Sequence, residues 1–535
     1  MLRKCAALGQ ALVLVACGGG AVTPAQSPTA GGAPAPGATA DKPGTLSESK
    51  VSGSGELPPG LPPPGPECAA FASEAPLTCA NGDFNERLAV ALEAPADERN
   101  RLLRCLEKAP EAPGGLMRAL RADLAPRGCA DDVLGSRPAD ANTPRDVSEM
   151  LVALAVGARL YRSVRQPPLP HPPFSKAEFS KQFKEVLTPW ISAQAHAVDV
   201  LSQVGPRLSG YAKAIVALEA GLADMRFVNV ARSIELPDEM KADPEIKETY
   251  LVTLEQALEP RVLRGRDAAL VGLGELQRLG ILNDVRLNDA RKLLSELFAG
   301  RRIDALDKLL LPALPALDTS SPALKIAAKL PAFYMLKLAA SPSVDDPKLL
   351  RARLEQGAPP ALWLNANSGG PPAPELASLN RRALFSLGQT YFWAEPFTRS
   401  AGIAAAPGDA EGALVVALSS LLAHGPRNAA ALMLGPPTLP AELRETSGLD
   451  ALAKQKGQVA GLAEFDAAYV RSLAPPANDP AFWRDEAQRY QRAQKKLTEK
   501  DAKLAADLAK AAGDTEKALK DAKNGAPPAA ATKAP

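Results

Sequence analysis

Apolar residues recur every three or four positions along most of the chain, which is the spacing of one buried face on an α-helix. Gly, Pro and capping residues interrupt this pattern at intervals and mark helix ends. Short helices are expected at 67–73 and 83–93, followed by two that open near Asp97 and Gly115. Longer ones are expected at 147–165, 175–204, 211–233, 244–263, 267–279, 286–298, 302–310, 322–338, 374–393, 409–423, 426–434 and 461–473. The predicted fold class is therefore all-α, with a bend near Pro189.

Helix pairs recur about every 35–45 residues between 210 and 340, a spacing typical of helical-hairpin arrays. Two places resemble the first helix of a tetratricopeptide repeat: Leu270, Leu273 and Gly274, and then Leu384, Leu387, Gly388 and Tyr391. The small residue of the second helix does not follow, because Arg286 and Ser400 stand at its position. The resemblance implies shared helix packing, and the body is predicted to be an irregular, solenoid-like array.

The last part of the chain carries a single apolar seam with a seven-residue repeat. Its members are Trp483, Tyr490, Leu497, Leu504, Ala511 and Ala518. Because the companion positions are mostly Ala, Lys, Asp or Gln, this pattern predicts one long charged helix from 479 to 523. That helix is expected to lie against the body, to form a weak coiled coil, or to pair with a second copy.

Four cysteines, Cys68, Cys79, Cys105 and Cys129, cluster at the start of the body, which is typical of two disulfides in an exported chain. If the helices between them pack as antiparallel hairpins, Cys79 and Cys105 share one end of the bundle. Cys68 and Cys129 share the other, and a helix length of about 15–18 Å separates the two ends. The nested pairing Cys79–Cys105 and Cys68–Cys129 is therefore predicted. A four-cysteine zinc site is the alternative, although C-x-x-C spacing is absent.

The first residues combine a basic start, Arg3 and Lys4, with an apolar run too short to span a bilayer. The run ends in Leu14-Val15-Ala16-Cys17, which resembles the lipobox of bacterial lipoproteins. The resemblance implies that Cys17 becomes the first mature residue and carries acyl chains such as palmitate, which together make a stable anchor. An Asp directly after the cysteine would, by this resemblance, favour retention in the inner membrane. Because Gly18 stands there instead, the resemblance implies the outer membrane if the host has one.

The balance of charged residues argues against one class of function, nucleic-acid binding. The chain has 62 basic and 60 acidic residues, and Arg3 and Lys4 lie in the predicted signal peptide, so the mature chain is formally neutral. A neutral exported protein is not expected to bind nucleic acid. The predicted segments are a signal peptide (1–16), a disordered Pro/Ala/Gly tether (17–66), a disulfide-stapled helical subdomain (67–137), a helical array (143–340), a second helical region (341–475), a charged C-terminal helix (476–523) and a disordered tail (524–535).

Few residues in the sequence form a pattern that indicates catalysis or ligand binding. The motifs H-E-x-x-H and G-x-S-x-G and the P-loop are absent, and no catalytic, cofactor or metal residue is assigned. Five rings lie between Phe385 and Phe397 in this aromatic-poor chain, so Tyr391 and Trp393 are a possible partner surface, against the alternative of a helix core. His196 with Asp199 is a possible ligand pair, and a satisfied or exposed histidine is favoured.

Two groups of arginines could hold an anion, although local ion pairs are favoured: Arg261, Arg264 and Arg266, and Arg301 with Arg302.

We expect a membrane-anchored, non-catalytic helical scaffold that binds a protein or cell-envelope partner. The alternative is an envelope enzyme that acts on glycan, or a carbohydrate-binding factor.

Overall fold

A computed structural model describes residues 62–72, 79, 81–135, 142–165, 167–169, 175–298, 300, 302–335, 337–338, 346–357, 374–434 and 439–523. These residues form helices and connecting segments, and the pairing of Ile281 with Gly357 is an isolated bridge rather than a strand. The all-α prediction is confirmed. Among the described helices, none has both the length and the apolarity needed to cross a bilayer.

The chain divides into two compact units, residues 1–272 and 273–535. The division falls inside the segment 143–340, which the sequence predicts as one array. The signal peptide, Cys17, most of the predicted tether and the tail 524–535 lie outside the described residues. Residues 62–65 and the 3₁₀ turn Pro66–Cys68 are described, so the last five residues of the predicted tether, 62–66, lie within the described part of the chain.

Five short helices open the first unit: α2 (Ala69–Ala72), α3 (Phe84–Glu93), α4 (Ala96–Cys105), α5 (Leu116–Asp123) and α6 (Ala130–Leu134). Asp83 caps α3, its carboxylate accepting from the Glu86 amide at 2.9 Å. Disulfides join Cys68 to Cys129 and Cys79 to Cys105, with Cα atoms 5.2 and 5.6 Å apart. This is the predicted nested pairing, and it leaves none of the four thiols for zinc.

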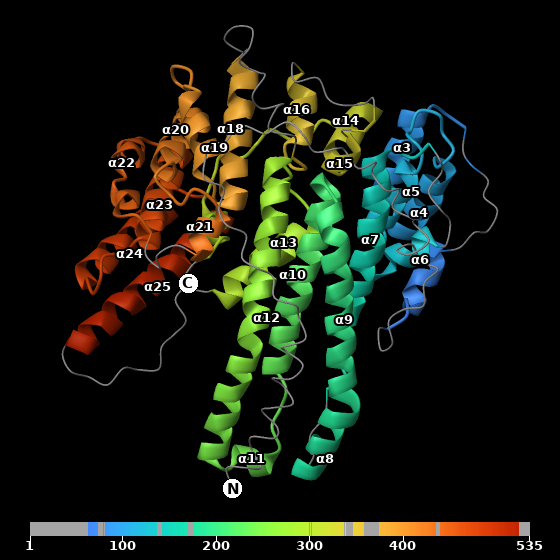
Figure 1. The fold of residues 1–535 in the computed structure, drawn as a ribbon. Coiled ribbons are helices and arrows are strands. Elements are labelled where there is room, and N and C mark those ends of the chain that lie inside the picture. The colour runs from blue at the N-terminus through green and yellow to red at the C-terminus, as the bar shows by residue number, and fades with distance from the viewer. Residues whose placement is uncertain are drawn as a thin grey trace, which may run out of the picture. The chain divides into compact units, whose positions relative to one another are not determined.

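Longer helices follow: α7 (Arg145–Ser163), α8 (Lys176–Gln182), α9 (Thr188–Val204) and α10 (Gly210–Arg232), drawn in cyan to green in Figure 1. A π-helical turn, Phe183–Leu187, joins α8 to α9 directly before Pro189. There the Thr188 N–H donates to the Phe183 carbonyl, five residues back. The irregularity predicted at Pro189 is thus one wide turn, because proline has no N–H to continue the regular ladder.

Glycines bring α10 and α12 (Pro244–Arg278) unusually close. A Cβ on Gly221 would lie 2.7 Å from both the Ala269 nitrogen and the Gly265 oxygen. The sequence predicts two helices, 244–263 and 267–279, with Gly265 in a turn between them. That prediction is wrong, because α12 is continuous and Gly265 serves the close packing instead of a turn.

The second unit holds α13 (Val285–Leu297), α14 (Pro322–Lys329), α15 (Ala332–Met335) and α16 (Pro347–Arg353). Its later helices are α18 (Pro374–Tyr391), α19 (Ala394–Gly402), α20 (Ala410–Leu422), α21 (Ala429–Leu434), α22 (Ser447–Ala453), α23 (Gln458–Leu473), α24 (Pro480–Gln494) and α25 (Glu499–Lys523). Neighbours along α18, α19 and α20, and along α22 to α25, pack directly on each other (orange to red in Figure 1). Successive packed helices of this kind thus occur at 374–422 and 447–523, beyond the segment 143–340 for which the helical-hairpin array is predicted.

The prediction of a single helix from 479 to 523 is wrong. The chain turns after Gln494, and α25 folds back on α24 so that Arg484 and Glu516 form an ion pair at 2.8 Å. Thr498 directly precedes the second helix, and its hydroxyl lies 2.9 Å from the Asp501 carboxylate. Of the predicted apolar seam, Tyr490 is buried, Trp483, Leu497, Leu504 and Ala511 are half-buried, and Ala518 is exposed. The hairpin also buries Ala493, Ala505 and Leu508, which lie outside the seam.

Candidate functional site

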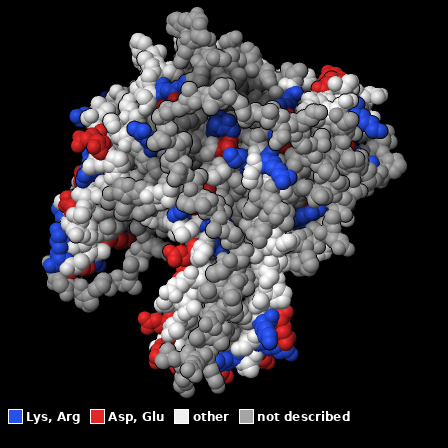
Figure 2. Space-filling model, in the orientation of Figure 1, with Lys and Arg blue, Asp and Glu red and all other residues white. Residues whose placement is uncertain are grey.

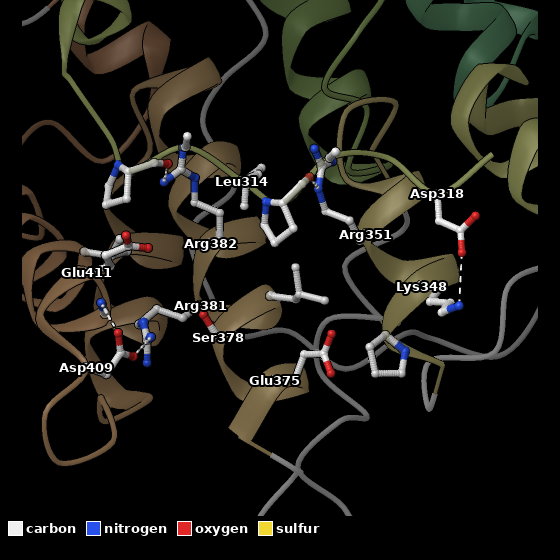
Figure 3. Close-up of a pocket in the computed structure, with 18 residues that line it drawn as sticks. Leu314, Asp318, Lys348, Arg351, Glu375, Ser378, Arg381, Arg382, Asp409 and Glu411 are labelled. Carbon is white, nitrogen blue, oxygen red and sulfur yellow. Dashed lines mark hydrogen bonds and ion pairs between the residues drawn. The ribbon is translucent and has the colours of Figure 1, made fainter. Parts of the chain in front are cut away.

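A groove of about 360 Å³ lies in the second unit between α16, α18, the start of α20 and an irregular segment before α14 (Figure 3). We call residues 309–320 the strap, because this stretch forms neither helix nor strand. A helix predicted at 302–310 is wrong: the chain makes only the 3₁₀ turn Ala305–Lys308 there. A neighbouring hollow shares Glu375, Arg381 and Asp409 with the groove.

The strap has a three-residue repeat, Leu311-Pro312-Ala313-Leu314-Pro315-Ala316-Leu317. Leu314 packs on a core cluster from α16 and α18 that includes Leu350 and Leu379. Leu317 packs on a second cluster from α14 and α16, which includes Leu324 and Ala352. Ala313 and Ala316 are exposed, so the repeat alternates half-buried leucines with solvent-facing alanines. One side of the strap thus belongs to the core, while the other forms a wall of the groove.

Arginines from two helices hold the strap in place by its carbonyls. Arg382 of α18 donates to the Pro312 oxygen at 3.2 Å, and Arg351 of α16 donates to the Pro315 oxygen at 3.0 Å. The Leu310 N–H in turn donates to the Asp466 carboxylate at 2.8 Å. These bonds satisfy backbone groups that have no helix or strand partner.

Burial shifts the pKa values of two ionisable groups under the strap. It lowers the pKa of Arg382 to about 10, so that the guanidinium still carries its charge at neutral pH. It raises the pKa of Asp466 well above its usual range, against the opposing effect of the bond from the Leu310 amide. The strap therefore lies over a fixed cation and a buried carboxyl.

The remaining cations of the groove have partners of their own. Arg381 is buried and lies 3.1 Å from the Asp409 carboxylate, while it also donates to the carbonyls of Ile403 and Ala404. Lys348 forms an ion pair with Asp318 at 3.0 Å. Glu375 and Glu411 are exposed, and neither makes a hydrogen bond or ion pair with another described residue. The charge of Glu411 does act on Arg382, because it raises the pKa of that guanidinium. Glu375 and Glu411 are therefore the carboxylates of the groove that are open to a hydrogen bond from a ligand.

The rest of the lining is apolar or small, with prolines and leucines from the strap beside Ser378 and Val415. No aromatic ring, histidine or cysteine occurs among the residues that line the groove. Such a surface can receive an extended chain by apolar contact and ion pairing. It lacks the flat ring on which a sugar stacks.

The aromatic residues predicted as a possible partner surface are mostly core. Tyr391 is 1% exposed, and its hydroxyl donates to the Ile281 carbonyl at 2.6 Å. Phe385 and Phe397 are buried edge to face with ring centroids 5.3 Å apart. Trp393 is half-buried and does not line the groove. The partner-surface prediction is wrong for Tyr391, and the helix-core alternative describes this cluster.

The arginines after the middle of α12 form internal ion pairs rather than an anion site. Arg264 donates two hydrogen bonds, of 2.6 and 2.8 Å, to the buried carboxylate of Asp224. Arg261 stacks 3.9 Å from the Phe227 ring centroid and also approaches Asp224. Arg266 pairs with the adjacent Asp267. The favoured alternative of local pairing is correct, although Asp224 of α10 is a partner that the spacing did not indicate.

The remaining candidates from the sequence, which are the histidines and the arginines near residue 301, do not form a binding site in the described part of the chain. His196 and His424 are exposed, while His171 and the Asp199 side chain are not described. Within the described residues, no cluster of three or more His, Cys, Asp or Glu could hold a metal. Arg302 pairs with Asp304 at 2.9 Å, and Arg301 is not described.

Comparison with other proteins adds no assignment, because the chain matches no protein-family model, no curated protein and no solved structure. The groove is therefore supported by the geometry of this structure alone. The sequence analysis missed it, although the Leu-Pro-Ala repeat of the strap is a visible signal: a period of three is foreign to both helix and strand.

Proposed function

We propose that this chain is an exported lipoprotein, anchored through acylated Cys17 in the cell envelope, whose helical body is a non-catalytic scaffold for a protein partner. The outer membrane is favoured where the host has two membranes. The signal for anchoring is the lipobox-like sequence before Cys17. The groove beside the strap is the partner site, and a polypeptide segment with a basic side chain is the ligand that suits it.

One observation carries the choice of ligand. The arginines and the lysine of the groove bind the strap, Asp409 and Asp318. Glu375 and Glu411 are its carboxylates that form no hydrogen bond or ion pair with another described residue, although the charge of Glu411 raises the pKa of Arg382. A Lys or Arg of the partner would form ion pairs with these two carboxylates, and the strap would provide apolar contacts beside them. Basic and acidic residues are otherwise interspersed on the face in Figure 2, which fits a neutral surface with local rather than general charge.

Site-specific photocrosslinking in intact envelopes tests this proposal. A photoreactive residue at Ser378, exposed in the groove, should form an adduct with a protein partner. The same residue at Ser420, exposed elsewhere in the second unit, should not. Equal adducts at both positions would count against the groove, and adducts to glycan alone would support the glycan-acting alternative.

Charge reversal supplies the matched control. Glu375→Lys with Glu411→Lys should reduce the Ser378 adduct about tenfold, because the partner's basic group then meets like charge. Glu442→Lys with Glu445→Lys makes the same change at exposed positions outside the groove and should leave the adduct intact. A similar yield in both double variants would contradict the assigned ligand chemistry.

A further inference from the structure

We propose that α25 is a surface of self-association, through which two copies of this chain pair with their α25 helices antiparallel. The surface is a row of six charged residues along the outer side of α25, in the hairpin drawn in red in Figure 1. We call it the charged row: Lys503, Asp507, Lys510, Asp514, Lys517 and Asp521. It is a different surface from the groove, and the proposal does not depend on the ligand proposed there.

The charged row lies opposite the buried face of α25. All six of its residues are exposed, whereas the helix buries Ala505, Leu508, Ala509 and Ala512. The row advances in steps of four and three residues, so its members stay in line along the helix. The average step of 3.5 residues is that of the seam between two paired helices. The pairing proposed here uses this charged face and not the apolar seam with the seven-residue repeat.

The six charges form no ion pair or hydrogen bond within the described part of the chain. On the same helix, Glu516 does make such pairs, because it lies 2.6 Å from Lys520 and 2.8 Å from Arg484. Within the charged row each Lys stands four residues before an Asp, which is the less favourable order for an ion pair on one helix. The charges of the row are therefore available to a second molecule.

The order of the charges matches an antiparallel second copy. Every position of the row has a counterpart at the same distance from Ala512 on its other side, and the two always carry opposite charge. These pairs are Lys510 with Asp514, Asp507 with Lys517, and Lys503 with Asp521, at two, five and nine residues from Ala512. When two α25 helices lie antiparallel and centred on Ala512, every Lys of one copy thus meets an Asp of the other.

Other occupants of this face match it less well. In a parallel pair each Lys would face a Lys and each Asp an Asp, and like charges repel. A uniformly acidic or basic partner would be repelled by half of the row, which holds three lysines and three aspartates. The antiparallel copy gives three ion pairs and their three symmetry mates around a twofold axis. A contact of this kind is self-complementary and closes as a dimer.

Gly513 supports a close approach at the centre of this contact. A glycine inside a helix weakens it, and in the described chain nothing beyond the backbone of its own helix lies within 4 Å of the Cβ that Gly513 lacks. The residues beside the row are also small: Ala506 on the side of Gly513, and Ala511 and Ala518 on the other side. Small side chains let two helix axes come close together. The lysines and aspartates can then reach across.

A hollow of about 560 Å³ between α24 and α25 borders the row on the side of Gly513. Gln488, Gln491 and Gln494 of α24 line it and are exposed. Their amides form no hydrogen bond with another described residue. An amide both donates and accepts, and a twofold axis brings this edge against the same edge of the second copy. The glutamines therefore extend the proposed contact beyond α25.

Crosslinking of the full chain, purified as the cell processes it, tests the antiparallel arrangement. In the proposed pair, the two copies of residue 511 lie about 3 Å apart along the helix axis and those of residue 518 about 18 Å apart. With a short bifunctional maleimide at low salt, Ala511→Cys should therefore crosslink to itself, whereas Ala518→Cys, on the same side of the row, should not. Cys68, Cys79, Cys105 and Cys129 are held in disulfides and do not react.

Sedimentation of the wild-type chain gives an independent reading. A dimer should form at low salt and dissociate at about 0.5 M salt, because exposed ion pairs are individually weak and are screened. A monomer at about 100 μM and low salt would overturn the proposal. Equal crosslinking at both cysteine positions would also overturn it, since that result means parallel or random contact.

Charge variants tie the dimer to the charged row. Lys510→Asp places like charges at both central contacts and should weaken dimerisation about tenfold. Lys510→Asp with Asp514→Lys restores opposite charges in the same register and should recover the dimer. Lys456→Asp makes the same charge change at an exposed position outside α25 and should leave the dimer unchanged. A double variant that stays as weak as Lys510→Asp would contradict this register.

Discussion

At the scale of single residues, the second unit contains a carboxyl that is costly to ionise. Glu486 of α24 is 0% exposed, and the Arg471 guanidinium lies 2.9 Å from its Oε1. Burial raises the pKa of Glu486 to about 8, although Arg471 and Arg489 oppose the rise and Asp485 and Asp450 add to it. The folded chain therefore holds a proton that the unfolded chain releases near pH 4.5.

The unfolding free energy should consequently fall as pH rises between about 5 and 8, because the folded state binds the extra proton in that window. Glu486→Gln keeps the shape of the side chain but removes the titration. It should be more stable than wild type at pH 8.5 by about 2–4 kcal/mol and about equal at pH 5. Denaturant titration at both pH values measures this, with Glu499→Gln, an exposed site, as control. Parallel pH slopes in Glu486→Gln and wild type would contradict the assignment.

Gly221 is a residue whose role is visible only in three dimensions. Its missing side chain lets α10 and α12 touch through backbone atoms. In sequence it is one glycine among 40, inside a regular apolar pattern. Helix propensity alone would favour alanine there by about 1 kcal/mol.

Gly221→Ala should nevertheless lower the unfolding free energy by about 1–3 kcal/mol, because the Ala269 nitrogen and the Gly265 oxygen are backbone atoms that cannot rotate away. The matched control is Gly274→Ala in α12, where nothing lies within 4 Å of the added Cβ. That variant should gain about 0.5–1 kcal/mol. Chemical denaturation followed by circular dichroism compares them, and a stabilised Gly221→Ala would refute the close contact.

At the scale of elements, the sequence located most helices because their apolar spacing and caps are local signals. α10 and α13 were predicted to within a residue or so at each end. Failures came where a residue serves a distant neighbour: Gly265 packs on α10, and the strap is shaped by Arg382 and Arg351. The break before α25 did have a local signal, Thr498 with Asp501 three residues on, which the seven-residue repeat concealed.

The disulfides are the elements whose energetic role can be stated most directly. Cys68 and Cys129 are 61 residues apart, while Cys79 and Cys105 are 26 apart. Loop closure gives each link about 3–4 kcal/mol, since the outer loop is shortened by the inner one. Cys68 and Cys129 are also buried, whereas Cys79 is exposed.

Replacing Cys68 and Cys129 by serine should therefore destabilise the first helices more than replacing Cys79 and Cys105. The first pair loses buried packing in addition to the link. Thermal unfolding with hydrogen exchange over residues 84–134 measures the difference. The reverse order, or non-reducing peptide maps that join Cys68 to Cys79, would contradict the nested arrangement.

At the scale of the whole molecule, fold class could be predicted from the sequence and the site could not. The groove is built from four segments that lie up to a hundred residues apart, near 312–318, 347–351, 375–382 and 409–415. No periodicity within one segment indicates that Arg382 will bind the carbonyl of Pro312, 70 residues earlier. The aromatic cluster stood out in sequence for composition alone, and such rings most often fill a core.

Anchoring is a property of the whole molecule that one residue should control. Cys17→Ala should release the chain from membranes, because acylation needs the thiol, whereas Cys5→Ala should leave it bound. Fractionation measures the release, and mass spectrometry of the wild-type N-terminus should find an acylated Cys17. An unmodified N-terminus at another residue would remove the basis for the proposed anchor.

The nested disulfides also bear on how such a chain is made. If the chain is exported with its N-terminus first, as proposed, Cys68 and Cys79 enter the oxidising compartment before Cys105 and Cys129. These first two thiols are not partners in the folded protein. Oxidation in order of arrival would join them wrongly, and only thiol exchange could correct the link. Production of this protein should therefore depend on a disulfide isomerase in the receiving compartment, and a host with an oxidase alone should accumulate misbridged chains.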